Sequence, residues 1–269
     1  MNLINDDSKN VSNTIGRRTL LLMPEFIVED GELKKGAGST IEITQNEVAI
    51  SGNQSLTINT EGISDASATL ELNYTPQEGN ATLSLSDGSD ATIPQASTAK
   101  VQINPQGNTP VETLNINTPT LTVELGAGTY NKVEALTAEQ TLIIGENVTI
   151  GELVLKGGNV KLEGDLALET PLVVGIETTI DLNGYQIKPA GTSMTQTLNT
   201  KDALILVRKG GSLTIKDSSG GTGRIDTGDN EDIMGAIKMT DSSDTAEAGN
   251  ATLEILGGTI KGYYYGIMG

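Results

Sequence analysis

Two eight-residue stretches decide the fold of this 269-residue chain: LVLKGGNV at residues 153–160 and LEILGGTI at residues 253–260. In both, apolar residues alternate with other residues as in a half-buried β-strand, and a Gly-Gly pair leads into a second strand. Looser strand, turn, strand segments begin at Ile180 and Ile205. The four starts lie 27, 25 and 48 residues apart, and 48 is two intervals of 24. Such a period predicts a solenoid, in which each unit buries its apolar face against the next.

The repeating unit is predicted to be a coil of strands rather than of helices. No window of the sequence shows a sustained helical stripe of apolar residues, and the units are rich in Gly, Thr, Asn, Val and Ile. Three strands of about 4 to 6 residues with their turns account for roughly 24 residues, one coil of a parallel β-helix. We therefore expect residues 110–269 to form a parallel β-helix of about six or seven coils. The Gly-Gly pairs would supply positive φ and space at its corners.

The first 109 residues have a different pattern. Short period-two segments such as Leu70-x-Leu72, Leu83-x-Leu85 and Val101-x-Ile103 are separated by turn residues, which predicts a small antiparallel, β-sandwich-like domain over residues 38–109. Residues 1–37 show no period and are predicted to be an irregular or disordered lead-in. The fold class is all-β. Because Gly269 follows a coil motif with no polar or helical cap, we expect the native protein to continue and its β-helix to be truncated here.

The composition excludes several classes of function. The chain has no His and no Cys, which excludes Ser-His-Asp and Cys-His catalysis, disulfides and the commonest zinc ligands. Its 17 basic and 35 acidic residues give a formal charge of −18, so nucleic acid is not an expected partner. No apolar stretch is long enough to span a membrane or to serve as a signal peptide. The acidic, Asn/Ser/Thr-rich β-pattern indicates an extracellular or cell-surface bacterial protein.

Several segments also resemble a known group of proteins. TTIDLNGYQI at residues 178–187, GSLTIKDSSGGTGRI at 211–225 and TLEILGGTIKGYYYGI at 252–267 are similar to coils of pectate-lyase-like right-handed parallel β-helix proteins. The likeness is greatest to large adhesin-like surface proteins of Bacteroides and related gut bacteria, and residues 121–164 resemble the same group. It covers about the last 160 residues. It implies the coil architecture but no particular activity, since this fold carries lyases, hydrolases, adhesins and spacers.

A lyase of the pectate type would imply acidic residues that hold calcium beside an Arg or Lys base. The best candidate segment is RIDTGDNED, residues 224–232. It offers Asp226, Asp229, Glu231 and Asp232 as possible metal ligands but does not match the 12-residue calcium-loop pattern. The alternative is a solvated turn whose acids keep other chains away. No cofactor is otherwise implied, and no pair of catalytic carboxylates stands out; the Gly-His-Gly signature of polygalacturonases is impossible without His.

Half of the six tyrosines stand together at residues 263–265. In a strand Tyr263 and Tyr265 would share one side, where they could stack on sugar rings. The alternative is that one Tyr packs inside and the others cover a coil edge. Asp181, Asn183 and Asp217 are most simply explained as turn residues that bond local backbone.

These observations favour a non-enzymatic, adhesin-like surface or secreted protein that presents a stalk or binding surface to a glycan or to a host or bacterial surface protein. The alternative is a calcium-dependent polysaccharide lyase or another carbohydrate-active β-helix enzyme. A third possibility is a structural spacer.

Overall fold

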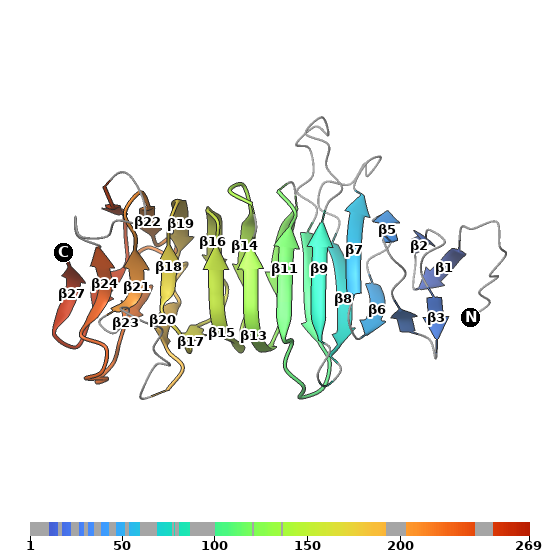
Figure 1. Cartoon of the computed structure of the whole chain (residues 1–269), viewed down its shortest axis with the longest axis horizontal. Coiled ribbons are helices and arrows are strands. Elements are labelled where there is room, and N and C mark those ends of the chain that lie inside the picture. Colours follow the sequence, from blue (N-terminus) through green and yellow to red (C-terminus); the bar gives the residue numbers. More distant parts are fainter. Residues whose placement is uncertain are drawn as a thin grey trace.

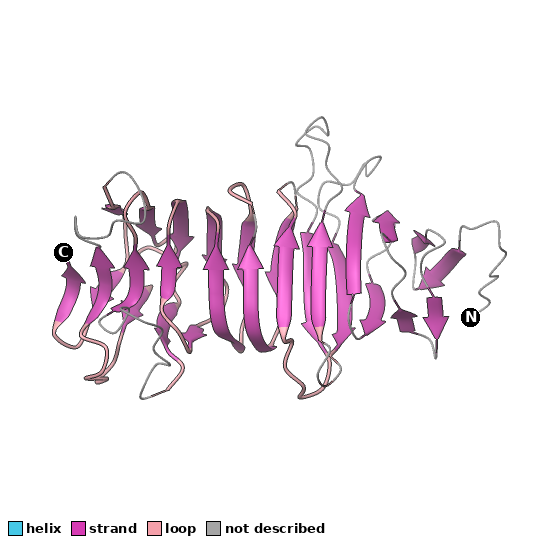
Figure 2. Ribbon diagram, in the orientation of Figure 1, coloured by secondary structure: helices cyan, strands magenta, loops and turns pink. Residues whose placement is uncertain are grey.

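Every described element of the chain is a β-strand (Figure 2). The computed structural model describes residues 69–76, 78, 81–86, 100–119, 121–135, 137–191, 203–239 and 250–269 in full, and strand backbone alone between residues 11 and 59. This part of the chain forms no helix with the length and apolar character that crossing a bilayer requires. The all-β prediction is confirmed.

The strands of the described residues are numbered in chain order. The first nine are β1 (Val11–Ile15), β2 (Arg18–Leu22), β3 (Ile27–Glu29), β4 (Glu32–Lys34), β5 (Ser39–Glu42), β6 (Glu47–Ser51), β7 (Gln54–Asn59), β8 (Thr69–Thr75) and β9 (Thr82–Ser86). The next nine are β10 (Lys100–Pro105), β11 (Thr113–Asn117), β12 (Thr122–Leu125), β13 (Gly128–Ala135), β14 (Thr141–Ile144), β15 (Val148–Leu155), β16 (Gly158–Leu162), β17 (Leu166–Leu168) and β18 (Leu172–Val174). The last nine are β19 (Glu177–Asp181), β20 (Gln186–Pro189), β21 (Ala203–Val207), β22 (Ser212–Lys216), β23 (Arg224–Asp226), β24 (Gly235–Met239), β25 (Thr252–Ile255), β26 (Thr259–Lys261) and β27 (Tyr265–Met268).

These strands belong to two sheets, a 16-stranded one that we call the long sheet and an 11-stranded one that we call the short sheet. The short sheet runs β25-β22-β19-β16-β14-β12-β10-β8-β6-β4-β3, so the chain returns to it once in every coil. All pairs among β5 to β27 are parallel. Figure 1 shows the strands side by side along the longest axis of the molecule. The architecture is a solenoid-like stack of parallel strands, with six short-sheet strands after residue 110.

The coil changes its cross-section at β15. Up to this strand each coil gives one strand to the long sheet, whereas β15 pairs with two strands of the next coil. Its first half lies against β17 through Thr149 and Ile150, and its second half against β18 through Val154 and Leu155. Every later coil gives two strands to the long sheet and one to the short sheet. The predicted three-strand coil is therefore found in the C-terminal half.

The strands expected within residues 38–109 are present, but their expected antiparallel pairing is wrong. β8 pairs in parallel with β10, and β9 with β11, so these strands are earlier coils of the same stack. Antiparallel pairing occurs only between β1 and β2, β2 and β5, and β3 and β4 among the described strands. Four short strands also lie within residues 11–34, where an irregular lead-in was expected. The side chains of that region are outside the described residues.

The two Gly-Gly stretches form corners of different kinds. Gly157 and Gly158 lead from the long-sheet strand β15 into β16 of the short sheet, whereas Gly257 and Gly258 lead from the short-sheet strand β25 into β26 of the long sheet. They are therefore not equivalent positions one whole number of coils apart. The register between β12 and β14 advances by 19 residues and that between β14 and β16 by 18, shorter than the expected period of about 24.

The corner glycines meet the backbone of the neighbouring coil. Gly158 has φ +91°, and a Cβ added to it would lie 2.2 Å from the carbonyl oxygen of Gln140. The same oxygen accepts a hydrogen bond of 2.7 Å from the N–H of Asn159. Since only glycine adopts this φ easily and leaves the space free, the predicted role of the Gly-Gly pair is confirmed at this corner.

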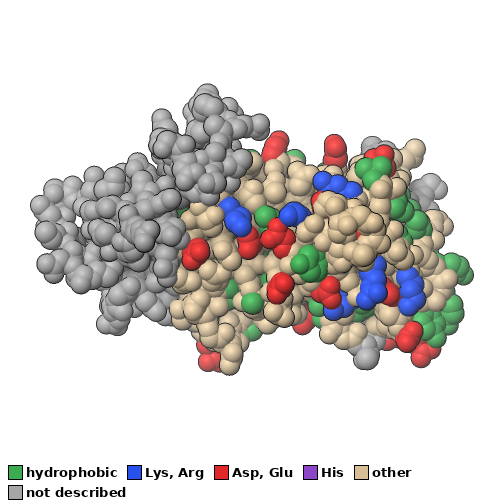
Figure 3. All heavy atoms as spheres, turned by 180° about the vertical axis from the view of Figure 1, so that it is seen from behind, with side chains coloured by type: hydrophobic (Ala, Val, Ile, Leu, Met, Phe, Trp, Pro, Cys, Tyr) green, Lys and Arg blue, Asp and Glu red, His purple; other side chains and the backbone are tan. Residues whose placement is uncertain are grey.

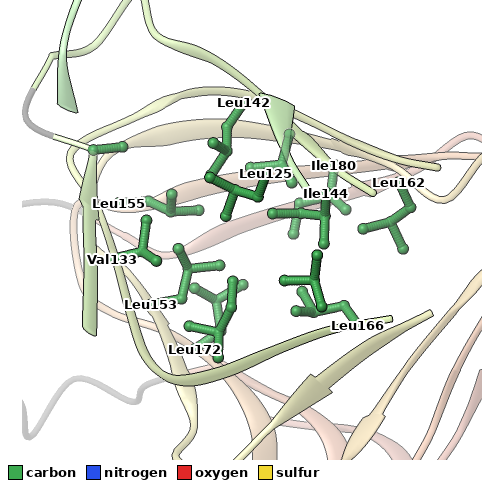
Figure 4. Close-up of a cluster of buried hydrophobic side chains, with 14 of the residues drawn as sticks. Leu125, Val133, Leu142, Ile144, Leu153, Leu155, Leu162, Leu166, Leu172 and Ile180 are labelled. Carbon is green, nitrogen blue, oxygen red and sulfur yellow. The ribbon is translucent and has the colours of Figure 1, made fainter. Parts of the chain in front are cut away.

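Columns of in-register apolar side chains fill the core between the sheets (Figure 4). One column of the short sheet joins residues that are at most 3% exposed: Leu70, Val101, Val123, Leu142, Val160, Ile180 and Ile215. Each such Leu, Ile or Val contributes about 1.5–3 kcal/mol by leaving water. Strand alternation thus sends these side chains inward and leaves the intervening polar residues outside.

Candidate functional site

The outward residues of β17, β20, β23 and β26 form a polar surface that crosses several coils, which we call the side wall. Parallel register places Ala167 of β17 beside Lys188 of β20, and Asp226 of β23 beside Lys261 of β26. In these strands the side chains directly before and after a core residue such as Ile187 or Ile225 face outward, because strand side chains alternate. The side wall therefore lines up side chains that are 21 or more residues apart in the chain.

Hydrogen bonds and ion pairs connect these outward side chains from coil to coil. The Lys188 ammonium lies 2.6 Å from the Asp165 carboxylate, and the Arg224 guanidinium donates to the Gln186 amide oxygen at 2.9 Å. Lys261 lies 3.4 Å from Asp226. Such exposed pairs add little stability, but they fix the orientation of the side chains that a ligand would meet.

The carboxyl group of Asp165 is ionised at neutral pH. Burial by itself would raise its pKa, but the hydrogen bonds from Lys188 and from the backbone N–H of Gln186, with the positive charges of Lys188 and Arg224, lower it below its usual value. A carboxyl group with a lowered pKa is a poor general acid. Asp165 is thus suited to accept hydrogen bonds and not to donate a proton.

A turn-rich loop at residues 227–232 borders the side wall. The Asp226 carboxylate accepts a 2.8 Å hydrogen bond from the N–H of Gly228, whose φ is +65°, and the Asn230 side chain accepts one of 3.0 Å from the N–H of Asp232. The Asp226 and Asn230 side chains thus each bond the backbone N–H two residues further on, which stabilises a tight turn. The loop leaves Asp229, Glu231 and Asp232 exposed to solvent.

Two hollows meet on the side wall. The first, of about 520 Å³, is lined by Gln186, Lys188, Pro189, Gly191 and residues 226–232, and the second, of about 500 Å³, by Glu146, Asn147, Val148, Thr149, Gly164, Asp165, Ala167, Tyr185 and Lys188. Lys188 lines both, so the two hollows adjoin, and together we call them the side-wall groove. Each hollow has the size of a small-molecule site.

Two buried polar atoms at the first hollow lack hydrogen-bond partners among the described residues. They are the hydroxyl oxygen of Thr227 and the amide nitrogen of Asn230, in side chains that are 2% and 9% exposed. A buried polar group without a partner costs about 1–3 kcal/mol, so such groups are uncommon and are often satisfied by water or a ligand. Both atoms lie beneath the surface of the hollow, so a ligand in the hollow would not reach them without a shift of the loop.

The structure brings the segment of Tyr263 to the end of the acidic loop, where the N–H of Tyr264 donates a 2.9 Å hydrogen bond to the Met234 carbonyl, but it separates Tyr263 from Tyr265. Negative charge on Glu231 is the main cause that raises the pKa of Tyr263, with smaller contributions from Tyr264, burial and Asp229. The rings of Tyr263 and Tyr264 meet edge to face with centroids 4.6 Å apart. Tyr265 begins β27 and shares its core side with Ile267, whose register partner Ile237 is fully buried. Only Tyr263 of the two predicted sugar-stacking residues is thus shown beside the loop.

The four predicted metal ligands do not come together in one cluster among the described residues. Asp226 is held by the backbone of Gly228 and by Lys261, while the other three acids point from an exposed loop. Nowhere in the described residues do three acidic side chains come together in a way that could hold a metal ion. Calcium needs six to eight oxygen ligands, and a calcium site at this loop stays a prediction.

Acidic residues at the ends of β19 and β22 hold turns, as predicted. The Asp217 carboxylate accepts hydrogen bonds from the N–H groups of Gly184, Ser219, Gly221 and Gly223 at 2.8–3.2 Å and from the Ser219 hydroxyl at 2.7 Å. Burial would raise its pKa, but these bonds outweigh it and lower the pKa to about 2. Asp181 likewise accepts from the N–H groups of Asn183 and Ser218.

Sequence reasoning missed Gln186, Lys188 and Asn230 as groove residues. Gln186 and Lys188 flank Ile187 in a period-two segment, so their outward direction was visible in the sequence, but the loop that faces them was not. Comparisons of the chain with protein-family models, with curated protein sequences and with solved structures found no match.

Proposed function

We propose that this chain is an extracellular or cell-surface, adhesin-like protein without enzymatic activity, a right-handed parallel β-helix that binds glycan in the side-wall groove. The observation that carries the proposal is the groove itself, two hollows of about 520 and 500 Å³ that share Lys188. A groove that crosses successive coils suits an extended chain of sugar rings better than a single compact ligand.

The chemistry of the lining supports a sugar ligand. Carboxylates, amides and an ammonium group can bond sugar hydroxyls as acceptors and donors. Tyr263 lines neither hollow, but it is 39% exposed next to Tyr264, whose N–H donates to the Met234 carbonyl at the end of the loop, and it offers an aromatic face on which a sugar ring that extends past the groove can stack.

The charge of the groove favours neutral glycans over uronates. Its lining holds six acidic residues, Glu146, Asp165, Asp226, Asp229, Glu231 and Asp232, against one basic residue, Lys188. Such an excess repels acidic polymers unless a cation bridges them. It also weighs against the polysaccharide-lyase alternative, whose substrates are uronates.

The test is a glycan array followed by calorimetric titration of each hit. Tyr263→Ala should weaken binding about five- to tenfold, the loss of roughly 1–1.5 kcal/mol of stacking. Tyr265→Ala is the matched control and should leave binding unchanged, because Tyr265 lies on the core side of β27. No binding to any glycan on the array, or equal loss in both variants, would refute the proposal.

Enzymatic activity is tested separately. The protein is incubated with pectin and polygalacturonate, with and without calcium, and unsaturated products are followed by their ultraviolet absorbance. We expect no product, and calcium-dependent product formation would favour the lyase alternative. Surface location is tested by protease treatment of intact cells, which should remove the protein if it is exposed outside.

A further inference from the structure

The turn between β19 and β20 contains the single Asn-Gly bond of the sequence, Asn183-Gly184. Asn before Gly is the pair most prone to deamidation, because glycine has no side chain to hinder attack by its backbone nitrogen. The nitrogen of Gly184 would bond to Cγ of Asn183, and the side-chain nitrogen would leave as ammonia with the proton that Gly184 loses. Water then opens the succinimide ring at Cγ, which gives Asp, or at the main-chain carbonyl carbon, which gives isoaspartate.

The folded chain holds both reacting groups in other contacts. The N–H of Gly184 donates a 2.8 Å hydrogen bond to the Asp217 carboxylate, so it points at the next coil. The Asn183 carboxamide donates to the Leu162 carbonyl oxygen at 2.9 Å and accepts from the Ser218 hydroxyl at 3.0 Å. Leu162 ends β16 and Ser218 follows β22, the strands on either side of β19 in the short sheet. The side chain of Asn183 is thus fixed to the coil before it and to the coil after it.

The turn is also closely packed. A Cβ added to Gly184 would lie 3.1 Å from Cβ of Ser219 and 3.1 Å from the Thr222 hydroxyl oxygen, so the segment after β22 lies directly against this bond. Asn183 has φ +45°, and its own N–H donates to the Asp181 carboxylate at 3.1 Å. Ring closure therefore requires the turn to leave its neighbours first.

Asp217 is not suited to assist the reaction as a base. Burial by itself would raise its pKa, but hydrogen bonds from four N–H groups and one hydroxyl outweigh burial and lower the pKa to about 2. A carboxylate with so low a pKa is a poor acceptor of the proton that the Gly184 nitrogen must lose. Its negative charge also opposes the build-up of electron density on that nitrogen.

We propose that Asn183 is a self-modification site that the fold keeps inactive, and that Asp217 is the residue that withholds the Gly184 nitrogen from it. If the turn opens, deamidation replaces the NH₂ group that faced the Leu162 carbonyl by a carboxylate oxygen, beside the carboxylates of Asp181 and Asp217. Like charges and a lost donor then oppose closure.

The product is marked permanently. Isoaspartate adds a carbon atom to the backbone of the turn, and either product adds one negative charge to a chain with a formal charge of −18. Figure 3 shows that acidic side chains are already exposed along the described coils, so the new charge meets repulsion rather than a basic surface. A chain that has once opened at this coil is therefore changed irreversibly, whereas a chain that stays closed is not.

The test is incubation of the 269-residue protein at mildly alkaline pH, with Asp and isoaspartate at residue 183 measured by peptide mapping and mass spectrometry. Three hydrogen bonds must open before attack, one of them to a charged group, so deamidation should be at least about a hundredfold slower in the folded protein than in guanidinium chloride at the same pH. Asp217→Asn should raise the rate at residue 183 about tenfold or more, because the Gly184 N–H loses a charged acceptor. Ser218→Ala, which removes the hydroxyl that bonds the carboxamide, should raise it about two- to tenfold.

A destabilised variant with an intact turn is the matched control. Ile116→Ala leaves a cavity at a fully buried position of β11, several coils away, and should not change the rate at residue 183, because the turn opens locally. Thermal melting shows which variants are folded, and should Asp217→Asn not be, Ser218→Ala decides. Equal rates in folded and unfolded protein, an unchanged rate in the deciding variant, or the same acceleration in Ile116→Ala would each overturn the proposal.

Discussion

Replacing Asp217 by Asn should destabilise the chain although the side chain keeps its shape. One carboxylate oxygen accepts from the N–H groups of Gly184 and Ser219 and from the Ser219 hydroxyl, and the other accepts from Gly221 and Gly223. An amide NH₂ in either place would face two N–H donors. Neither orientation of the new side chain can satisfy all of them.

The size of the effect follows from these contacts. Two N–H groups lose a charged acceptor, and hydrogen bonds to charged groups contribute about 1.5–3 kcal/mol each when buried. Because Asp217 is only partly buried, water replaces part of this loss, and we expect the free energy of unfolding to fall by about 2–3 kcal/mol. For a chain of this size the midpoint temperature would fall by roughly 5–10 °C.

The assay is thermal unfolding at neutral pH followed by circular dichroism, with urea titration as a second measurement. Asp229→Asn is the matched control, because it makes the same chemical change on an exposed loop residue and should shift the midpoint by less than about 2 °C. If Asp217→Asn melts within the same narrow range as Asp229→Asn, the carboxylate does not hold these turns and the reasoning is wrong.

Three further predictions concern pH, a corner and the core. The pKa of Asp217 is about 2 in the folded chain and near its ordinary value of 3.8 in the unfolded chain. The stability that its ionised carboxylate contributes is therefore complete above about pH 5 and declines as the pH falls toward 2. When the free energy of unfolding is measured against pH, its loss in acid should be shallower in Asp217→Asn than in the unchanged protein. Gly158→Ala should lower the free energy of unfolding in urea by about 3 kcal/mol or more, because its Cβ would clash with the Gln140 carbonyl oxygen. Gly220→Ala, at a similar φ with no atom within 4 Å of the added Cβ, should lower it by only about 1 kcal/mol. Equal losses in the two variants would show that the clash at Gly158 is not the cause. Ile144→Ala should lower the free energy of unfolding by about 2–5 kcal/mol by leaving a cavity among the buried residues in register with it, such as Leu125 and Leu162. A loss under about 1 kcal/mol would show that the core at Ile144 is not closely packed.

The sequence was a good guide to strands and a poor guide to their partners. The alternation at Leu70 and Leu72 predicts a half-buried strand, and β8 is found there with both residues buried. The same alternation occurs in antiparallel and parallel sheets, so it does not contain the direction of the neighbouring strand. The antiparallel prediction for residues 38–109 was wrong for this reason.

The Gly-Gly motif predicted corners but not the length of a coil. A corner needs positive φ and a small residue wherever it occurs, so both sheets can use the same eight-residue pattern. Leu153 lies in the long sheet and Leu253 in the short sheet, although their surrounding sequences match. The prediction treated a local requirement of the backbone as a global repeat.

The candidate site depends on contacts that the sequence does not specify. Tyr263 and Glu231 are 32 residues apart, and they interact because the coil between them brings its end back to the same corner. To predict that proximity one would need to know the number of residues in that coil, and this number varies from coil to coil because the loops differ in length. The turn roles of Asp181 and Asp217 depend on residues close by in the chain and on one neighbouring coil, and they were predicted correctly.

The pairing of β13 with β15 indicates how a molecule of this design can change its length. Both strands have eight residues and lie in register over seven pairs, from Gly128 and Val148 to Ala135 and Leu155. If residues 136–155 were removed, β13 would occupy the place of β15 and offer its two halves to β17 and β18. Inserting or deleting a stretch that returns the chain to the same register would alter only the number of coils. Inserting or deleting a single residue within a strand would instead turn inward-facing side chains outward. The unit in which this chain can evolve its length is therefore the complete turn, and single insertions or deletions should be confined to its corners.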